Sequence, residues 1–290
     1  MNTRKGFLAL LTTGLIYGSF GILIRTLDKE LLMYQQIFLR NLIAFLFAGI
    51  LVIILKQKFS YAKTPKKHLF FYAFSYPLAI IFFVASVLST KIAVTVFSYY
   101  IGLIIFSTLI GFIFLKEKLT RFKIISMIFV LIGLIFFSMP LSITSLNLGL
   151  FMGLLSGSSE SITNTFRKLL GGNLDRFVLV AIQMLSGIII SGLLLIIFKQ
   201  AYISSISSIS IILSLLFGIF LMSVSYLTLV GFQSFDLNLG AIVISSELIF
   251  ASLFAAIFFK EYPTVYESIG GAFVLLAIIT ANLRTGVKKI

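Results

Sequence analysis

The sequence predicts an all-α polytopic membrane protein, in which ten transmembrane helices form two inverted five-helix repeats and both termini are cytoplasmic. Its composition, its long apolar segments and an internal repeat lead to this prediction. Hydrophobic residues make up 60% of the 290-residue chain and charged residues 11%, whereas soluble domains carry about 25% charged residues. Such a chain buries its apolar surface in lipid, where a helical span needs about 20 apolar residues.

Ten apolar segments lie between short polar breaks, and we expect each of them to be a transmembrane helix. The segments are 6–24, 32–55, 69–88, 93–115, 124–139, 148–166, 177–198, 209–231, 239–259 and 265–283. The first could be mistaken for a signal peptide, but its apolar run continues to Ile24 and it lacks an Ala-x-Ala cleavage site. We therefore expect it to remain in place as the first helix.

Residues 112–131 and 256–275 are two versions of one segment. FIFLKEKLTRFKIISMIFVL recurs 144 positions later as AIFFKEYPTVYESIGGAFVL, and both copies carry Lys-Glu-x-x-Thr where an apolar run ends. The ten segments then divide into a first repeat, 1–141, and a second repeat, 142–290. Because five spans is an odd number, the second repeat is inverted in the membrane. Inverted repeats are typical of transporters, which place their binding site where the repeats meet.

The 23 lysines and arginines are distributed unevenly over the two predicted sides of the membrane. Seventeen fall on the side of the N-terminus, five fall on the opposite side, and Arg40 lies within a predicted span. The five are Arg25, Lys29, Lys91, Lys199 and Lys260. This bias predicts cytoplasmic termini by the positive-inside rule. It also accounts for the net charge of +14 through topology and anionic lipids, so the lipid bilayer, and not nucleic acid, is the expected partner.

The residue inventory argues against several other classes of protein. The chain has no cysteine, so we expect no disulfides and no thiolate chemistry. It has one histidine, His68, which cannot form a multi-histidine metal site. It also lacks a glycine-rich phosphate loop, which argues against direct ATP-driven pumping. We expect no cofactor, no bound metal and no enzymatic activity.

Three ionisable residues, Arg40, Glu160 and Glu247, lie deep inside predicted spans. A charge in hydrocarbon costs at least about 2.5–3.5 kcal/mol, so such residues usually face a cavity or a partner. The rise of a helix places all three near the middle of the membrane. In one interpretation Arg40 neutralises one glutamate and the set holds the bundle together. In the other, at least one carboxylate faces a cavity and binds a substrate amine or a proton.

Other polar residues within the spans extend the set of candidates. Ser156, Glu160, Thr163, Asn164 and Arg167 recur at helical spacing and form one polar stripe, which should face inward. Tyrosines within spans need a partner for the hydroxyl, and each either lines the cavity or packs with its hydroxyl satisfied. These tyrosines are Tyr17, Tyr76, Tyr99, Tyr100 and Tyr226.

Small residues, a proline and the repeated acidic residues have structural or gating interpretations. Rows of glycine at four-residue spacing allow close helix packing, and they occur at Gly14, Gly18, Gly149, Gly153 and Gly157. Pro77 marks either a hinge or a kink that only shapes packing. Glu117 and Glu261 either end helices and form salt bridges or latch an inner and an outer gate. Thr120 and Thr264 are expected to cap the following helices.

The motifs resemble those of the ten-helix drug/metabolite transporters, often called EamA-like. The resemblance rests on YGSFGILIR (17–25), FLRNLIA (38–44), the two Lys-Glu-x-x-Thr junctions, the Gln183 region and SSELIFASLF (245–254). The chain departs from the family pattern in lacking a proline near Leu103 and Leu248 and in having no tryptophan. The departures bear on the substrate more than on the fold.

The resemblance implies a secondary carrier in a bacterial cytoplasmic (inner) membrane, with a central cavity that opens alternately to each side. Typical substrates are amino acids and other small metabolites, commonly exported. The residues proposed for substrate binding are Glu160, Glu247, Arg40, Tyr17, Tyr76, Tyr99, Asn164 and Tyr226. Protons are a candidate coupling ion, and a homodimer is a candidate assembly. The alternatives are uptake or exchange of a larger cationic metabolite such as S-adenosylmethionine, and a flippase for lipid headgroups or lipid carriers.

Overall fold

The computed structural model describes residues 3–58, 64–90, 92–137, 139, 148–202, 206–260 and 262–283. All regular structure within these ranges is helical. The helices are α1 (Thr3–Tyr17), α2 (Phe20–Leu27), α3 (Met33–Ile54), α4 (Lys66–Ser89), α5 (Ile92–Leu115), α6 (Arg121–Phe137), α7 (Leu148–Leu170), α8 (Arg176–Ile197), α9 (Ser208–Phe232), α10 (Leu237–Ile244), α11 (Glu247–Phe259) and α12 (Val265–Leu283).

The prediction of ten helical spans is confirmed, with two spans interrupted near their middle. Helices α1 and α2 together occupy the first predicted segment, and α10 and α11 occupy the ninth. Predicted and observed ends differ by four residues or fewer, because polar breaks in an apolar chain mark where helices leave the lipid. Seven of the described helical stretches are long and apolar enough to cross a membrane. The predicted repeat boundary, between residues 141 and 142, lies outside the described residues.

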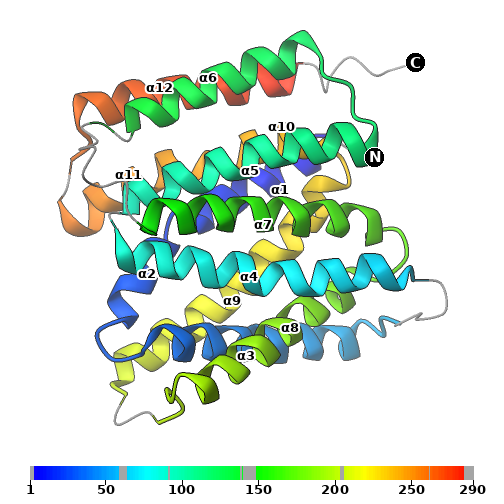
Figure 1. Cartoon of the computed structure of the whole chain (residues 1–290), viewed down its shortest axis with the longest axis vertical. Helices are drawn as coiled ribbons and strands as arrows, with labels where there is room; N and C mark the ends of the chain where they lie inside the picture. The colour runs from blue at the N-terminus through cyan, green and yellow to red at the C-terminus, as the bar shows by residue number, and fades with distance from the viewer. Residues whose placement is uncertain are drawn as a thin grey trace.

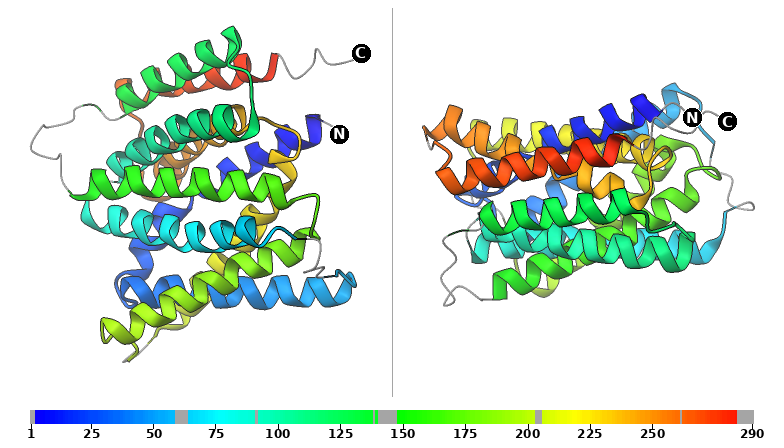
Figure 2. Two further views of the ribbon diagram at one scale, coloured as in Figure 1. Left: turned by 45° about the vertical axis from the view of Figure 1, so that its right-hand side comes forward. Right: turned by 90° about the horizontal axis from the view of Figure 1, so that it is seen from above.

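The packing of the helices has the symmetry expected of two repeats. Helix α7 packs against α4 and α5, and its counterpart α1 packs against α9 and against α10 and α11. Two pairs of equivalent helices pack on each other, α3 with α8 and α6 with α12, and they form opposite edges of the bundle (Figure 1). The start of α1 and the end of α12 lie on the same side (Figure 2). That this side is cytoplasmic stays a prediction.

The two helix interruptions lie against each other. Helix α1 ends at Tyr17, and α11 begins at Glu247 after a turn at residues 245–246. A Cβ added to Gly14 would lie 2.9 Å from the carbonyl oxygen of Ile244, and one added to Gly18 would lie 3.0 Å from the amide nitrogen of Ala251. Only glycine therefore allows α1 to approach the interruption this closely, and polar backbone is brought to the centre of the bundle.

The glycine row of α7 has the packing role that its spacing predicts. It lies against α5 and the end of α4, where Cβ atoms at Gly149 and Gly153 would clash with Thr90 and Ser98. A Cβ at Gly157 would lie 2.6 Å from the amide nitrogen of Leu103 and closer still to the carbonyl oxygen of Tyr99. These are backbone atoms of a packed helix, so they cannot move aside without displacing α5.

Gly157→Ala should therefore destabilise the protein by about 1–3 kcal/mol, the usual cost of overpacking. The measurement is the melting temperature of the purified protein in one detergent. Gly49→Ala in α3 is the matched control, because a Cβ there meets nothing within 4 Å and alanine favours the helix. Equal melting temperatures for Gly157→Ala and Gly49→Ala would contradict the packing role.

Candidate functional site

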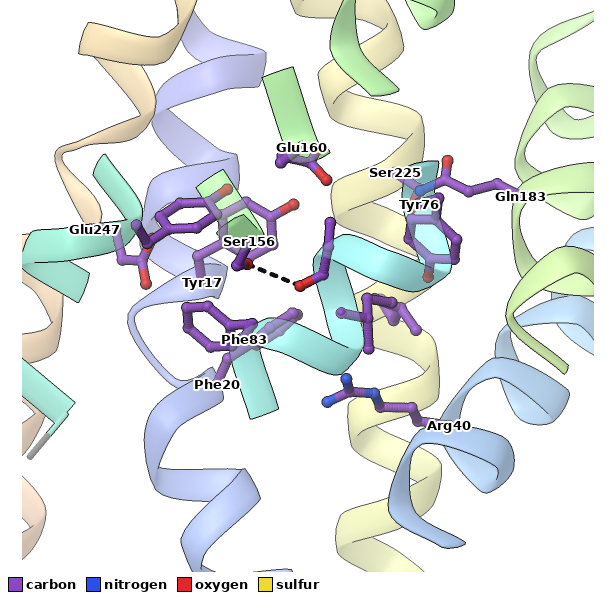
Figure 3. Close-up of a pocket in the computed structure, with 14 residues that line it drawn as sticks. Tyr17, Phe20, Arg40, Tyr76, Phe83, Ser156, Glu160, Gln183, Ser225 and Glu247 are labelled. Carbon is purple, nitrogen blue, oxygen red and sulfur yellow. Dashed lines mark hydrogen bonds between the residues drawn. The ribbon is translucent and has the colours of Figure 1, made fainter. Parts of the chain in front are cut away.

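A cavity lies in the centre of the bundle beside the two interruptions, and its empty space of about 570 Å³ includes the part that is open to the surroundings. Helices of both repeats line it, as the close-up shows (Figure 3). The lining residues are Tyr17, Phe20, Arg40, Tyr76, Ala79, Ile80, Phe83, Tyr99, Ser156, Glu160, Gln183, Leu221, Ser225 and Glu247.

Glu247, the first residue of α11, is a cavity carboxylate that forms no ion pair among the described residues. Its Oε2 accepts a hydrogen bond of 2.5 Å from the Tyr100 hydroxyl, which also lies 3.0 Å from the carbonyl oxygen of Ile244. The side chain is 4% exposed. A buried carboxylate without a cation is unfavourable in the ionised form, so the site is suited to bind a proton or a cationic group.

Glu160 is paired, but with Arg167 and not with Arg40. Arg167 Nη1 lies 3.3 Å from Glu160 Oε1 and also donates to Asn164 Oδ1, while Nη2 lies 3.2 Å from Gln183 Oε1. The Tyr72 hydroxyl donates to the same Gln183 oxygen at 2.7 Å. These contacts form a polar layer between α4, α7 and α8, below called the closing layer, at the end of the cavity nearest the α7–α8 connection.

Arg40 enters the cavity from α3, on the side opposite Glu247 (Figure 3). Its guanidinium carbon lies 4.6 Å from the ring centroid of Phe217, a cation–π contact. It forms no hydrogen bond or ion pair with any described residue, and its Nε is buried without a partner. The interpretation in which Arg40 neutralises a glutamate therefore does not describe this structure.

The structure brings most of the predicted site residues together. Tyr17, Tyr76 and Tyr99 line the cavity with Arg40, Glu160 and Glu247. Asn164 and Tyr226 are not among the lining residues: Asn164 holds Arg167, and the Tyr226 ring stacks on Phe177 at 4.7 Å. Pro77 is buried within α4, next to the cavity residue Tyr76.

Sequence reasoning missed several residues of the site. Gln183 links the cavity to the closing layer, and only its inclusion in the family motifs pointed to it. Ser225, Phe20 and Phe83 carry no signal that separates them from packing residues in an apolar span. Tyr72 was overlooked because it lies near the end of its predicted segment.

A second polar cluster lies at the same end of the bundle as the closing layer. Glu117, which follows α5, accepts hydrogen bonds of 3.1 Å at both oxygens from the first amide of α10, at Leu237, and one of 2.9 Å from Lys168. Lys123 lies 3.7 Å from Glu117 and 2.7 Å from Asp236. The carboxylate thus caps α10 and ties α5 and α7 to it.

The other residues of the repeated element behave differently in the two copies. Glu261 lies outside the described residues. The predicted cap at Thr264 is confirmed, and it takes the form of a capping box: Thr264 Oγ1 accepts from the Glu267 amide and Glu267 Oε2 accepts from the Thr264 amide. The Thr120 hydroxyl, by contrast, is buried without a partner, so the predicted cap at Thr120 is wrong.

Glu117→Gln should loosen the end of the bundle that holds the α7–α8 connection, which is predicted to be cytoplasmic, because it removes the counter-charge of two lysines and the charge at the start of α10. The chain has no cysteine, so a single cysteine at Ser225 can report access to the cavity. We expect Glu117→Gln to accelerate its reaction with a membrane-impermeant thiol reagent in inside-out vesicles. Glu267→Gln, which loses a cap on the peripheral α12, is the control; equal rates in both variants would argue against a gate at Glu117.

The comparisons with known proteins agree with this architecture. The model of the EamA-like transporter family matches residues 4–139 and 147–283. A crystal structure superposes with a TM-score of 0.81 over 97% of this chain and 98% of its own, at 13% sequence identity, which supports the fold alone. No curated protein matches the chain in sequence. Since the family model covers almost the entire sequence in two successive copies, the chain belongs to the EamA-like transporter family.

Proposed function

We propose that the protein is a secondary active transporter that exports small polar organic metabolites, namely amino acids or related compounds, by alternating access. The observation that carries the proposal is the central cavity, which presents an unpaired carboxylate, Glu247, between the two repeats. Helices of both repeats line the cavity, and a buried carboxylate without a cation suits a proton or an amine. The export direction and the bacterial cytoplasmic membrane are taken from the family resemblance.

The closing layer supplies a route from binding to conformational change. Glu160 lines the cavity and also holds Arg167, so a substrate amine at Glu160 would compete directly with Arg167. Release of Arg167 would free Gln183 and Asn164, which join α7 and α8 on the closed side. Substrate binding would thereby weaken the closed state, as alternating access requires. The proton is the proposed coupling ion, with Glu247 as its binding residue.

The decisive experiment is transport by purified protein in proteoliposomes. Labelled amino acids should exchange across the membrane, and an imposed proton gradient should drive their accumulation. Labelled S-adenosylmethionine and a fluorescent phospholipid are tested in parallel, because they represent a larger cationic substrate and flippase activity. Movement of the phospholipid without movement of any soluble solute would overturn the proposal.

A further inference from the structure

The guanidinium of Arg40 is a buried cation to which the described part of the chain offers no anion. The side chain is 3% exposed and lies two turns from the start of α3. The guanidinium forms a cation–π contact with the ring of Phe217, and its Nε is buried without a hydrogen-bond partner. Arg167, the other buried arginine among the described residues, also has an Nε without a partner, but its terminal nitrogens contact Glu160, Asn164 and Gln183.

Such an arrangement is unfavourable unless something else supplies the partner. Removing a cation from water costs several kcal/mol, and a ring face returns only part of that cost. A guanidinium cannot give up its charge, and it has five N–H donors and no acceptor. The group that satisfies it must therefore be an anion or a strong acceptor that enters the cavity, since the guanidinium is directed there (Figure 3).

The charges of the cavity are also separated in space. Arg40 comes from α3 beside α9, whereas Glu247 comes from the α10–α11 interruption beside Tyr17, Tyr99 and Tyr100. Glu160, the remaining cavity carboxylate, is occupied by Arg167. The open cavity thus has a cationic side and an acidic side, which a molecule with opposite charges at its two ends would complement.

We propose that Arg40 is a carboxylate-binding subsite and that the transported molecule must carry a carboxylate. The planar fork of a guanidinium matches the two oxygens of a carboxylate, which makes this pairing strong and directional. The inference rests on the proposed function, because it assigns one end of the substrate of that same cavity. It also orients the substrate, with the carboxylate towards α3 and any amine towards the side of the cavity that carries Glu160 and Glu247.

The test uses three matched sets of probes on the purified full-length protein: leucine, phenylalanine and glutamine, each with its amide and its decarboxylated amine. Affinities come from thermal-shift titrations, and transport comes from counterflow in proteoliposomes. At least one amino acid should bind wild type about 10- to 100-fold more tightly than its amide and amine, the range expected for a charged hydrogen bond. Arg40→Met should abolish this preference, and Arg40→Lys should restore it in part.

The melting temperature without ligand separates a ligand-binding arginine from a structural one. Arg40→Met removes an uncompensated buried charge, so it should melt at or above the wild-type temperature. Arg25→Met is the control, because Arg25 is exposed and donates to the carbonyl oxygen of Thr90 at 2.9 Å, outside the cavity. It should leave the preference for carboxylates unchanged.

Several results would overturn the subsite. A clear drop in the melting temperature of Arg40→Met would do so, as would a wild-type protein that binds no carboxylate. So would amides or amines that bind as tightly as the acids. The last such result is an Arg40-dependent rise in melting temperature with chloride or phosphate alone that equals the rise with the amino acids. The two proposals can fail separately. Transport of the amines as fast as the acids would leave the carrier and exclude the subsite. Arg40-dependent binding of acids without any transport would support the subsite and exclude the carrier.

Discussion

Glu247→Gln is expected to lower the transport rate about 10- to 100-fold while the protein inserts and melts like wild type. The carboxylate forms no ion pair with a described residue, so its removal leaves no cation stranded. A glutamine oxygen can still accept the hydrogen bond from Tyr100. What is lost is the charge that binds a proton or a substrate amine, and a charged hydrogen bond corresponds to roughly this factor.

Counterflow in proteoliposomes, measured over a range of pH, checks this prediction. If Glu247 binds the coupling proton, the pH dependence of wild type should become flat in the variant. The groups that face this carboxylate from neighbouring helices are Tyr100, which donates to it, and Tyr17 and Tyr99, which line the same cavity; all three remain in place. Glu267→Gln, on the exposed surface of α12, controls for loss of a carboxylate in general. Transport at the wild-type rate by Glu247→Gln would end the assignment.

The fold could be predicted from the sequence because lipid imposes simple rules on it. Polar groups are excluded from the hydrocarbon, so helix ends coincide with polar breaks; the last predicted segment, 265–283, has the same bounds as α12. The two interruptions could not be predicted in this way. Residues 18–19 are Gly-Ser and residues 245–246 are Ser-Ser, and neither pair is accompanied by a proline. Such pairs favour helix kinks, but the same residue types lie at 157–159 within the unbroken helix α7, so the sequence pattern does not tell the two cases apart.

The residues of the cavity were predicted better than their partners. Depth in the membrane follows from position along a helix, which is why Arg40, Glu160 and Glu247 were expected at one level. Pairing depends on how the helices are rotated about their axes, and no local pattern contains that information. Arg167 shows the consequence: it was counted as a charge on the cytoplasmic side, yet it is 1% exposed and is the partner of Glu160.

Breaking the pair of Glu160 and Arg167 should have the largest effect on stability, about 3–5 kcal/mol for the loss of one partner of a buried ion pair. Glu160→Gln should be the more damaging change, because Arg167 keeps its charge and stays buried. Arg167→Met should be milder, because the remaining carboxylate can take up a proton. Its defect should accordingly shrink as the pH falls, whereas the defect of Glu160→Gln should not.

The double variant Glu160→Gln/Arg167→Met tests whether the two residues act as a pair. It should be more stable than Glu160→Gln alone, since no buried charge is left without a partner. Melting temperatures of the four proteins in one detergent give the coupling energy. Arg176→Met is the control: this arginine contacts Gln233 at 2.9 Å and is half-buried, and its loss should cost less than about 1 kcal/mol.

Additive effects of the two single variants would show that Arg167 is held by Asn164 and Gln183 alone. In that case substrate at Glu160 could not open the closing layer by displacing Arg167, and the proposed link between binding and conformational change would be lost.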